Sequence, residues 1–386
     1  MIFRHLKILE YALGSLLRRR YKNLAILVVY SFTIATLASI LFLTHALKAE
    51  STRLLAGAPE VVVQRIAAGR HALVPLTYAG KIRSIPGVGT VTPRYWGYDY
   101  DGLTKANYTL MGVDGPPEIP GSLEGRLPEA AGECAIGPGV AKLRGTRIGG
   151  ELILVDSRNT GVIFEVTGIF HPVSRLLTND LILLPRQDLL DFFGLSVDRA
   201  TDLRVQVYNP NEIDTVAAKI KALLPDTRPI TRGEMVRTYD AVFNWRSGMM
   251  LSVFGAALIA FCILAWDKAT GLSAEERREI GILKATGWDT GDVLELKFWE
   301  GLAVSLTAFL LGVTTAYVHV FFFGATVLAP VLKGWSVLFP SFDLIPYIDA
   351  YQVFVIAFLT IIPYVASTVI PSWKAAITDP EQAMRS

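Results

Sequence analysis

The distribution of apolar and polar residues divides the chain into four long apolar runs and one long segment of mixed character. The apolar runs occupy 24–47, 248–266, 298–323 and 351–370. Each run is long enough to cross, as a helix, a bilayer hydrocarbon core of about 30 Å. The pattern therefore predicts four transmembrane helices, at 24–47, 246–267, 298–323 and 351–370.

The segment at 48–245 has the pattern of a folded domain. Alternating or β-branched runs separated by Gly and Pro predict strands, and a helix predicted at 212–224 has Val216, Ile220, Leu223 and Leu224 on one face. The predicted strands are 60–66, 108–113, 151–155, 162–169, 180–184 and 202–207, with further short helices at 140–144 and 187–193. This mixture predicts an α+β domain inserted between spans 1 and 2.

The distribution of Lys and Arg predicts the orientation in the membrane. Residues 1–22 carry six Lys or Arg and one acid, and 268–297 carries five, whereas Lys333 is the only one in 324–350. By the positive-inside rule, the basic segments face the cytoplasm. Residues 1–23, 268–297 and the tail 371–386 are therefore expected in the cytoplasm, and the 48–245 domain and the 324–350 loop outside.

The predicted fold class is thus an α-helical membrane protein with four transmembrane helices plus an α+β extracytoplasmic domain inserted between spans 1 and 2. The chain is 52% hydrophobic and 19% charged, a balance more apolar than that of a typical soluble domain. We interpret the first run as an uncleaved anchor, because it is longer than a signal-peptide core and lacks a small-residue cleavage site. The expected location is the inner (cytoplasmic) membrane, with both termini in the cytoplasm.

Motifs for chemistry are absent from the sequence. No Gly-rich P-loop precedes a Lys-Ser/Thr pair, so nucleotide phosphates would have to be held by another polypeptide. There is no Gly-x-Ser-x-Gly elbow or metal-binding spacing, and the five His are scattered. Cys134 and Cys262 fall in different predicted compartments and are not expected to pair. We therefore predict no catalytic residue and no metal ligand, and the net charge of +2 gives no reason to expect nucleic acid as a partner.

The charged stretch between the second and third spans has the pattern of a capped helix. Ser273 and Glu276 form a capping-box pair, and Gly287 can close the helix in a left-handed conformation. Ile280 and Leu283 form an apolar stripe on it. Such a helix either docks on a protein partner or rests on the lipid surface, and the pattern alone does not decide between the two.

Two other patterns concern the membrane. Residues 1–23 place leucines at helical spacing among basic residues, which predicts a cytoplasmic interfacial helix. Small residues at every fourth position let membrane helices approach closely, although chance in a run rich in Ala and Ser is an equal alternative. The residues predicted to pack in this way are Ser31, Ala35 and Ser39 in the first span and Gly312 and Ala316 in the third. We expect the first-span set to join two copies of the chain, or one copy and a homologue.

Residues 276–287, Glu-Arg-Arg-Glu-Ile-Gly-Ile-Leu-Lys-Ala-Thr-Gly, resemble the coupling-helix signature of FtsX/MacB-type ABC-transporter permeases. The short pieces at 111–114, 125–128, 133–137 and 166–169 resemble, in order, the extracytoplasmic core domain of MacB-like and lipoprotein-release permeases. The resemblance implies that the charged helix docks on a cytoplasmic ATPase. The implied ATPase-coupling residues are Glu276, Arg277, Arg278, Glu279, Ile280, Gly281, Leu283, Lys284 and Gly287.

The resemblance further implies a permease of two protomers above a dimeric ATPase, in the form that lacks a fused ATPase domain. Such a permease transmits motion to a substrate outside the membrane, and lipid, lipoprotein or drug-like molecules are the expected substrates. ATP and magnesium are expected in the partner ATPase, and this chain is expected to hold no cofactor. The sequence leaves open whether an extracytoplasmic adaptor or substrate protein also binds. The alternatives are a signalling or scaffold subunit without transport and, less favoured, a membrane enzyme.

Overall fold

The computed structural model describes residues 2–115, 122–171, 178–270, 274–333 and 346–377. Within them the chain forms two compact units, each described here by itself. The helical unit contains residues up to Ala46 and most of the chain from Asn244 onward, and the sheet domain contains Leu47–Phe243. The helices of the helical unit, two of which continue into the sheet domain, are α1 (Ile2–Arg18), α2 (Arg20–Ala56), α8 (Arg232–Thr270), α9 (Ala274–Ala285), α10 (Thr290–Phe321) and α12 (Ala350–Ile377).

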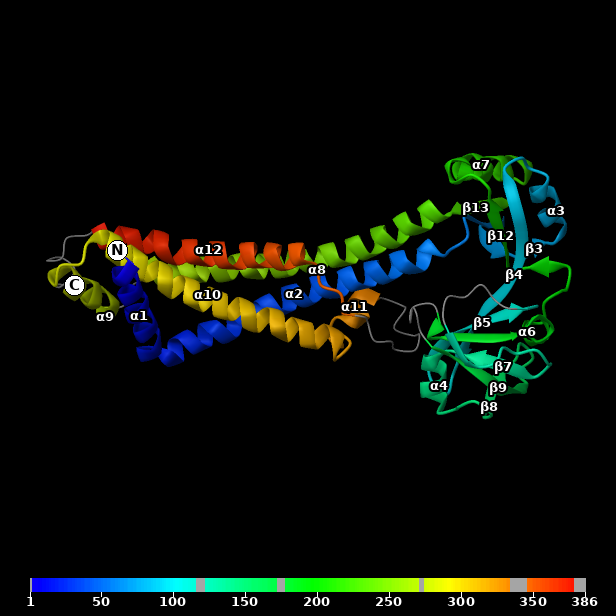
Figure 1. Ribbon diagram of the computed structural model, residues 1–386, viewed down its shortest axis with the longest axis horizontal. Helices are drawn as coiled ribbons and strands as arrows, with labels where there is room; N and C mark the ends of the chain where they lie inside the picture. The colour runs from blue at the N-terminus through cyan, green and yellow to red at the C-terminus, as the bar shows by residue number, and fades with distance from the viewer. Residues whose placement is uncertain (1, 116–121, 172–177, 271–273, 334–345, 378–386) are drawn as a thin grey trace. The chain divides into compact units, whose positions relative to one another are not determined.

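Four of these helices are long and apolar enough to cross a membrane: α2, α8, α10 and α12. Each of the four runs that the sequence pattern predicts falls on one of these helices, and the third, 298–323, extends two residues past the end of α10 at Phe321. Figure 1 shows α10 and α12 running alongside each other in the helical unit, and Gly301 explains how closely they approach. A Cβ at Gly301 would lie 2.6 Å from the hydroxyl of Thr368, so only glycine fits between the two helices.

An aromatic cluster joins three of the spans. The ring of Tyr30 on α2 stacks against Phe261 of α8 and Tyr364 of α12, with centroids 4.5 and 5.0 Å apart. The Tyr30 hydroxyl donates a hydrogen bond to the carbonyl oxygen of Thr360. A buried phenol thus finds a polar partner while its ring fills the space between helices. This cluster fixes the side of α2 that faces α8 and α12.

The sheet domain is built on a mixed sheet of eleven strands. Its main path runs β13-β1-β12-β4-β5-β10-β7-β9-β6, with β2 paired to β1 and β8 paired to β9. Most pairs are antiparallel, and β5–β10 and β7–β9 are parallel. The strands are β1 (Val61–Ala67), β2 (Arg70–Ala72), β4 (Val88–Asp101), β5 (Ala106–Val113), β6 (Ser122–Gly125), β7 (Glu133–Ile136), β8 (Glu151–Val155), β9 (Gly161–His171), β10 (Leu181–Pro185), β12 (Asp202–Val207) and β13 (Thr227–Thr231). Two short strands, β3 (Val74–Pro75) and β11 (Arg199–Ala200), pair separately.

One face of the sheet carries the main hydrophobic core, to which short helices contribute. Leu110 and Leu184 from the strands, Leu189 from α6 and Ile220 from α7 are all fully buried there. The helices of this domain are α3 (Thr77–Arg83), α4 (Pro138–Arg144), α6 (Arg186–Phe193), the 3-10 turn η1 (Pro210–Glu212) and α7 (Ile213–Leu223). A short helix α11 (Ala329–Lys333) follows α10 in the chain. An α+β sheet domain and four apolar helices are therefore confirmed.

The longest strand, β4, is absent from the predicted set. Its sequence contains Gly89, Pro93 and Gly97, which interrupt the alternation expected of a strand. Gly97 is needed because a Cβ there would lie 2.9 Å from the ring of Phe193 on α6. The close approach of a helix to the strand, which local sequence does not reveal, thus explains the irregular pattern.

Candidate coupling site

We name residues 274–296, comprising α9 and the first turns of α10, the elbow. The elbow contains all the predicted coupling residues. The structure does not describe the side chains of Glu276, Arg277 and Arg278. Gly281 is buried in α9, and Lys284 stands in the last turn, where a cation suits the helix dipole. Gly287 has a φ of +98°, so it ends the helix in the left-handed conformation that the sequence predicts.

The start of α10 is fixed by a capping box in which Asp289 is the N-cap. The Asp289 carboxylate accepts a hydrogen bond from the backbone N–H of Asp292 at 2.8 Å, and the Asp292 carboxylate accepts one from the N–H of Asp289 at 3.1 Å. The bond from the Asp292 N–H lowers the pKa of Asp289, and the charge of Arg4 lowers it further. The Asp289 carboxylate is therefore held in the charged form at the helix start.

Helix α1 binds the elbow through two sets of polar contacts. Glu279 of α9 accepts hydrogen bonds from the Tyr11 hydroxyl at 3.0 Å and from the guanidinium groups of Arg18 and Arg19 at 3.0 and 2.7 Å. Burial and then the neighbouring Glu279 raise the pKa of Tyr11, which keeps the phenol protonated as the donor. One carboxylate of α9 thus accepts from two donors of α1 and from Arg19, which directly follows it.

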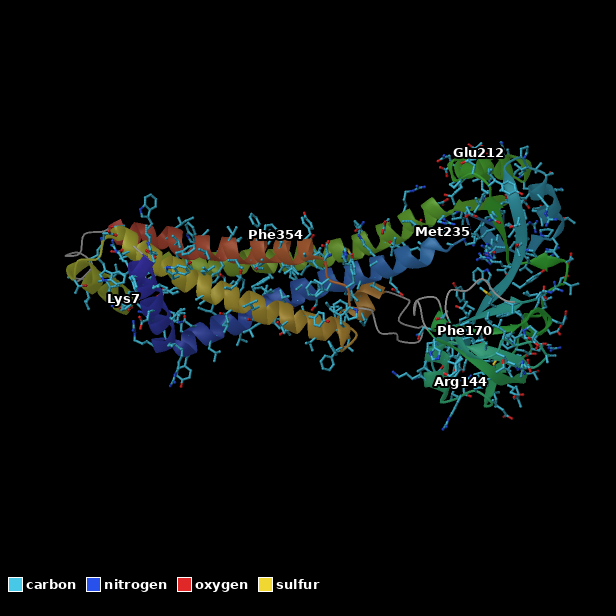
Figure 2. All side chains as sticks on the ribbon, viewed as in Figure 1. Lys7, Arg144, Phe170, Glu212, Met235 and Phe354 are labelled. Carbon is cyan, nitrogen blue, oxygen red and sulfur yellow. The ribbon has the colours of Figure 1, made fainter. Side chains whose placement is uncertain are left out.

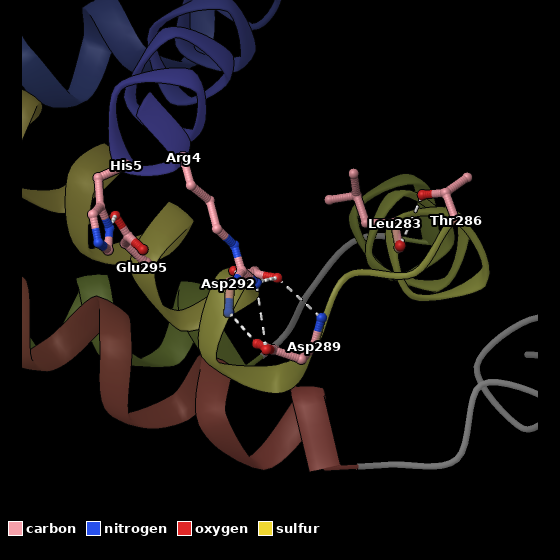
Figure 3. A network of polar contacts seen from close by, with 7 residues as sticks. All are labelled: Arg4, His5, Leu283, Thr286, Asp289, Asp292 and Glu295. Atoms are coloured by element: carbon pink, nitrogen blue, oxygen red, sulfur yellow. Dashed lines mark hydrogen bonds and ion pairs between the residues drawn. The ribbon is translucent and has the colours of Figure 1, made fainter. Parts of the chain in front are cut away.

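The second set lies at the start of α10 (Figure 3). The guanidinium of Arg4 pairs with the carboxylate of Asp292 at 2.5 Å and reaches Asp289 at 3.4 Å. One turn further along, the ring of His5 contacts Glu295, with 2.7 Å between Nδ1 and Oε1. The acids that cap α10 are therefore also the acids that hold the N-terminal end of α1.

An apolar cluster lies among these polar contacts. Leu283 of α9 and Leu296 of α10 pack with Ile8 and Ala12 of α1, and Tyr11, Trp288 and Trp299 border them. Ile280 and Leu283 are each 7% exposed, whereas Ile282 is 51% exposed. Ile280 and Leu283, which the family resemblance implies as ATPase-coupling residues, are thus buried within the chain, and α1 covers Leu283. The ATPase-coupling role of the elbow as a whole stays a prediction.

The contact between α1 and the elbow escaped the sequence analysis. Capping and apolar patterns are local, whereas Tyr11 and Glu279 are 268 positions apart in the chain. One signal was available: the N-terminal segment is basic, and the elbow supplies Glu279, Asp289, Asp292 and Glu295. Complementary charge in two segments predicted to lie on the same side of the membrane favours contact between them.

The predicted small-residue set lies between helices of the same chain. A Cβ at Gly312 of α10 would lie 2.7 Å from Ile34 Cγ2 and 3.0 Å from the carbonyl oxygen of Ser31, both on α2. Ala316 and Ala35 are buried, and the Ser39 hydroxyl lies 3.1 Å from Nδ1 of His319 on α10. Because these residues are already covered within one chain, little of this face of α2 is left for a second protomer. The expectation that Ala35 joins two copies stays a prediction.

In the sheet domain, one arginine ties together the two ends where the chain enters and leaves. Arg232, the first residue of α8, donates through Nε and Nη2 to the carbonyl oxygen of Ala58, at 2.8 and 2.5 Å, and pairs with Glu60 at 2.9 Å. Its backbone N–H donates to the Glu60 carbonyl oxygen at 2.9 Å. Ala58 and Glu60 directly follow α2, so the ends of α2 and α8 in this domain are held together.

Over the part of the chain that the structure describes, no group of three or more His, Cys, Asp or Glu side chains is arranged to hold a metal ion. Cys134 is buried and Cys262 lies in α8, and both are free thiols. The features that the two units present are therefore helix termini, ion pairs and packing contacts. They suit a protein that moves or docks.

These features define a class: multi-span membrane proteins that carry a large domain between the first two spans. The chain belongs to the FtsX/MacB-type permeases, because residues 27–223 match the family of the MacB-like periplasmic core domain and residues 249–380 match that of the FtsX-like permease C-terminal. It is therefore the permease subunit of an ABC transporter and an inner-membrane protein. No match was found among curated proteins.

Two solved structures are similar to the sheet domain. The periplasmic region of MacB from Actinobacillus actinomycetemcomitans is 13% identical, with 48% of this chain and 94% of that chain covered and a TM-score of 0.35. The extracellular domain of the noncanonic ABC-type transporter YknZ from Gram-positive bacteria is 13% identical, with 44% of this chain and 99% of that chain covered and a TM-score of 0.31. The assignment to the family rests on the two family matches.

Proposed function

We propose that this permease couples ATP hydrolysis by a separate cytoplasmic ATPase to movement of its sheet domain outside the membrane. The work done is the export or extraction of a lipid, a lipoprotein or a drug-like molecule. A second permease, identical or homologous, completes the complex, and ATP and magnesium bind in the ATPase. In this proposal both termini and the elbow face the cytoplasm.

The observation that carries the proposal is the joint at Arg232. Coupling between distant sites needs a physical path whose elements have two arrangements. Because Arg232 bonds Ala58 and Glu60, α2 and α8 cannot move independently where they meet the sheet domain. A displacement of the two helices would therefore act on the domain through one point and not through two flexible linkers.

At the other end of the path the elbow supplies the surface for the ATPase. It contains helix α9, which has 12 residues, ends at the turn at Gly287 and is followed directly by the capped start of α10. Since Leu283 and Glu279 are engaged by α1, the docking surface proposed here consists of Arg277, Arg278 and the exposed Ile282. A buried apolar residue flanked by charges is the usual composition of an interface centre.

The test is reversal of charge at the proposed docking surface. We expect Arg277→Glu with Arg278→Glu to release the ATPase or to separate hydrolysis from substrate movement in proteoliposomes, while the permease inserts normally. The matched control is Arg70→Glu with Lys219→Glu, which makes the same change of charge at two exposed positions of the sheet domain. If the first double variant retains the ATPase and transports at the wild-type rate, the proposed docking surface is wrong.

The alternative is a signalling or scaffold subunit that changes the ATPase without moving a substrate. Both functions predict that a ligand of the sheet domain alters ATP hydrolysis. They differ in whether material leaves the bilayer, so lipid or reporter release from the same proteoliposomes separates them. Identification by mass spectrometry of molecules that copurify with the complex would name the substrate.

A further inference from the structure

We propose that α1 is the positioning element of the elbow: it holds α9 and the start of α10 at a fixed mutual angle through Glu279 and Asp292. The proposal rests on the proposed function, because the purpose of this angle is to present α9 to the ATPase. It assigns Glu279 to an internal contact, in place of the contact with the ATPase that the family resemblance implied. Tyr11, Arg18 and Arg19 are then positioning residues, and none of them touches the partner.

Glu279 is the centre of the contact with α9. Its side chain is 25% exposed, and three donors, two from α1 and one from the adjoining Arg19, converge on its two oxygens. The guanidinium of Arg18 also lies 5.2 Å from the centre of the Tyr11 ring, within range of a cation–π interaction. A single exposed ion pair contributes little to stability, but a shared carboxylate with three donors forms a network that fixes the direction of α9 relative to α1.

Asp292 is the centre of the contact with α10. Only 11% of its side chain is exposed, and it serves two functions, since it completes the capping box and accepts Arg4. An α1 that left the elbow would therefore also disturb the start of α10. Glu279 and Asp292 lie on either side of the turn at Gly287, so α1 spans that turn and limits its rotation.

The apolar cluster prevents α1 from sliding between these two polar contacts. Ile8 and Ala12, which lie between Arg4 and Arg18 in sequence, are 4% and 0% exposed against Leu283 and Leu296. A chain turn with a left-handed glycine has freedom to swing. The brace formed by α1 removes that freedom by packing on both helices at once.

Binding of α1 to lipid headgroups, the simpler explanation for its basic residues, leaves this arrangement unexplained. The leucines Leu6, Leu13 and Leu17 are exposed and recur at spacings of seven and four residues, on a face different from that of Arg4, Ile8 and Ala12. The leucine face suffices for contact with a lipid surface. On the opposite side, Arg4 and Arg18 of α1 and the adjoining Arg19 form ion pairs with acidic side chains of the same chain.

The experiment exchanges the charges of one pair in the full chain and measures geometry and coupling separately. Glu279→Lys should break the contact, and the added change Arg19→Glu should restore it, because the two side chains are 2.7 Å apart. Glu10→Lys makes the same charge change at an exposed position of α1 and serves as the matched control. Spin labels at Leu13→Cys and Ala285→Cys, both exposed and both outside the proposed docking surface, report the α1–α9 distance once Cys134 and Cys262 are replaced by Ala.

We expect the distance distribution to broaden in Glu279→Lys and to narrow again in the exchanged pair. Substrate moved per ATP hydrolysed should fall by roughly two- to thirtyfold and recover with the geometry. An unchanged distance distribution in Glu279→Lys overturns the proposal, and so does a broadened distribution with normal coupling. If the wild-type complex moves no substrate at all while the distances respond as expected, the proposed function fails and the brace stands.

Discussion

The sheet domain and the helical unit place their large apolar side chains in opposite ways. Leu110 and Leu184 are fully buried among strands and helices of the sheet domain. By contrast, Ile259 on α8 and Phe354 on α12 are more than half exposed, and Figure 2 shows Phe354 projecting from its helix. In the most apolar stretch of α8 only 12% of the residues are buried, against 50% in that of α2. A lipid bilayer supplies the apolar surroundings that a core supplies elsewhere.

This difference shows where specificity must come from in each unit. The sheet domain is determined by the volume of a core, in which each methylene group matters. The helical unit has little driving force from apolar burial between helices, so it relies on a few close contacts: Gly312 against Ile34, the Tyr30 aromatic cluster, and α1 on the elbow. Substitutions at these positions should therefore affect the two units differently.

The largest effect is expected from a cavity in the sheet domain. Leu110→Ala should lower the free energy of local opening of β5 by about 4 kcal/mol, because the side chain is fully buried and a cavity remains. Hydrogen exchange of the β5 amides in the full chain measures this. The control, Ile259→Ala in α8, should leave exchange of α8 unchanged in a bilayer; equal losses in both would contradict the comparison.

The next effect concerns an ion pair of the sheet domain whose carboxylate is buried. The Asp202 carboxylate, 1% exposed, accepts from Arg94 at 2.7 and 2.8 Å and from the Trp96 indole at 2.9 Å. Asp202→Ala leaves these donors unpaired and should cost about 3 kcal/mol, seen as faster exchange in β4 and β12. The exposed pair Arg228–Glu234 is the reference: Glu234→Ala should cost less than about 1 kcal/mol.

In the helical unit the expected loss comes from added volume. Gly312→Ala would place a methyl group 2.7 Å from Ile34 and should cost about 2 kcal/mol, because α10 must move away from α2. Gly255→Ala in α8 is the matched control, since nothing lies within 4 Å of its added Cβ. Reversible unfolding of the full chain in mixed micelles compares the two. Helix propensity by itself favours Ala over Gly, so a loss from Gly255→Ala as large as that from Gly312→Ala would show that the close approach of α10 to α2 is not the cause.

The elements that the sequence predicts well are those whose cause is local. The four apolar runs and strands such as β8 follow from residues that are neighbours in the chain, as does the turn at Gly287. Strand β4 was missed because Gly97 is required by the close approach of Phe193, which lies on a helix distant in sequence. For the same reason the apolar stripe at Ile280 and Leu283 was identified, but the contact of Leu283 with α1 was not. A pattern shows that a face is covered, and only the structure shows that α1 covers Leu283.

The smallest expected effect is a dependence of sheet-domain stability on pH. Asp180 is buried at the start of the β10 segment, where its carboxylate accepts a hydrogen bond from the Thr109 hydroxyl at 2.6 Å. Burial raises the pKa of Asp180 above its usual value, more than the bond from Thr109 lowers it. The folded domain therefore keeps this proton to higher pH than the unfolded chain does.

The sign of the effect follows from linkage. Stability that depends on protonated Asp180 is fully present below the unfolded pKa of about 3.9 and is lost as the pH rises through the raised folded pKa. Asn at this position still accepts from Thr109 but never ionises. We therefore expect Asp180→Asn to be more stable than the wild type at pH 7, by about 1 kcal/mol, and the difference to vanish below about pH 4.

Glu133 provides the control of opposite sign. Its pKa is lowered to about 2, first by the hydrogen bond from Arg126 and then by the backbone N–H groups of Ala130 and Glu129. Its contribution is therefore present at neutral pH and is lost as the pH falls through the folded pKa. Glu133→Gln should lower stability at pH 7, where Asp180→Asn raises it, and thermal unfolding of the full chain at pH 7 and pH 4 measures both. If the two variants shift stability in the same direction at pH 7, burial does not control the pKa of Asp180. The contrast between the buried Asp180 and the arginine-paired Glu133 then fails.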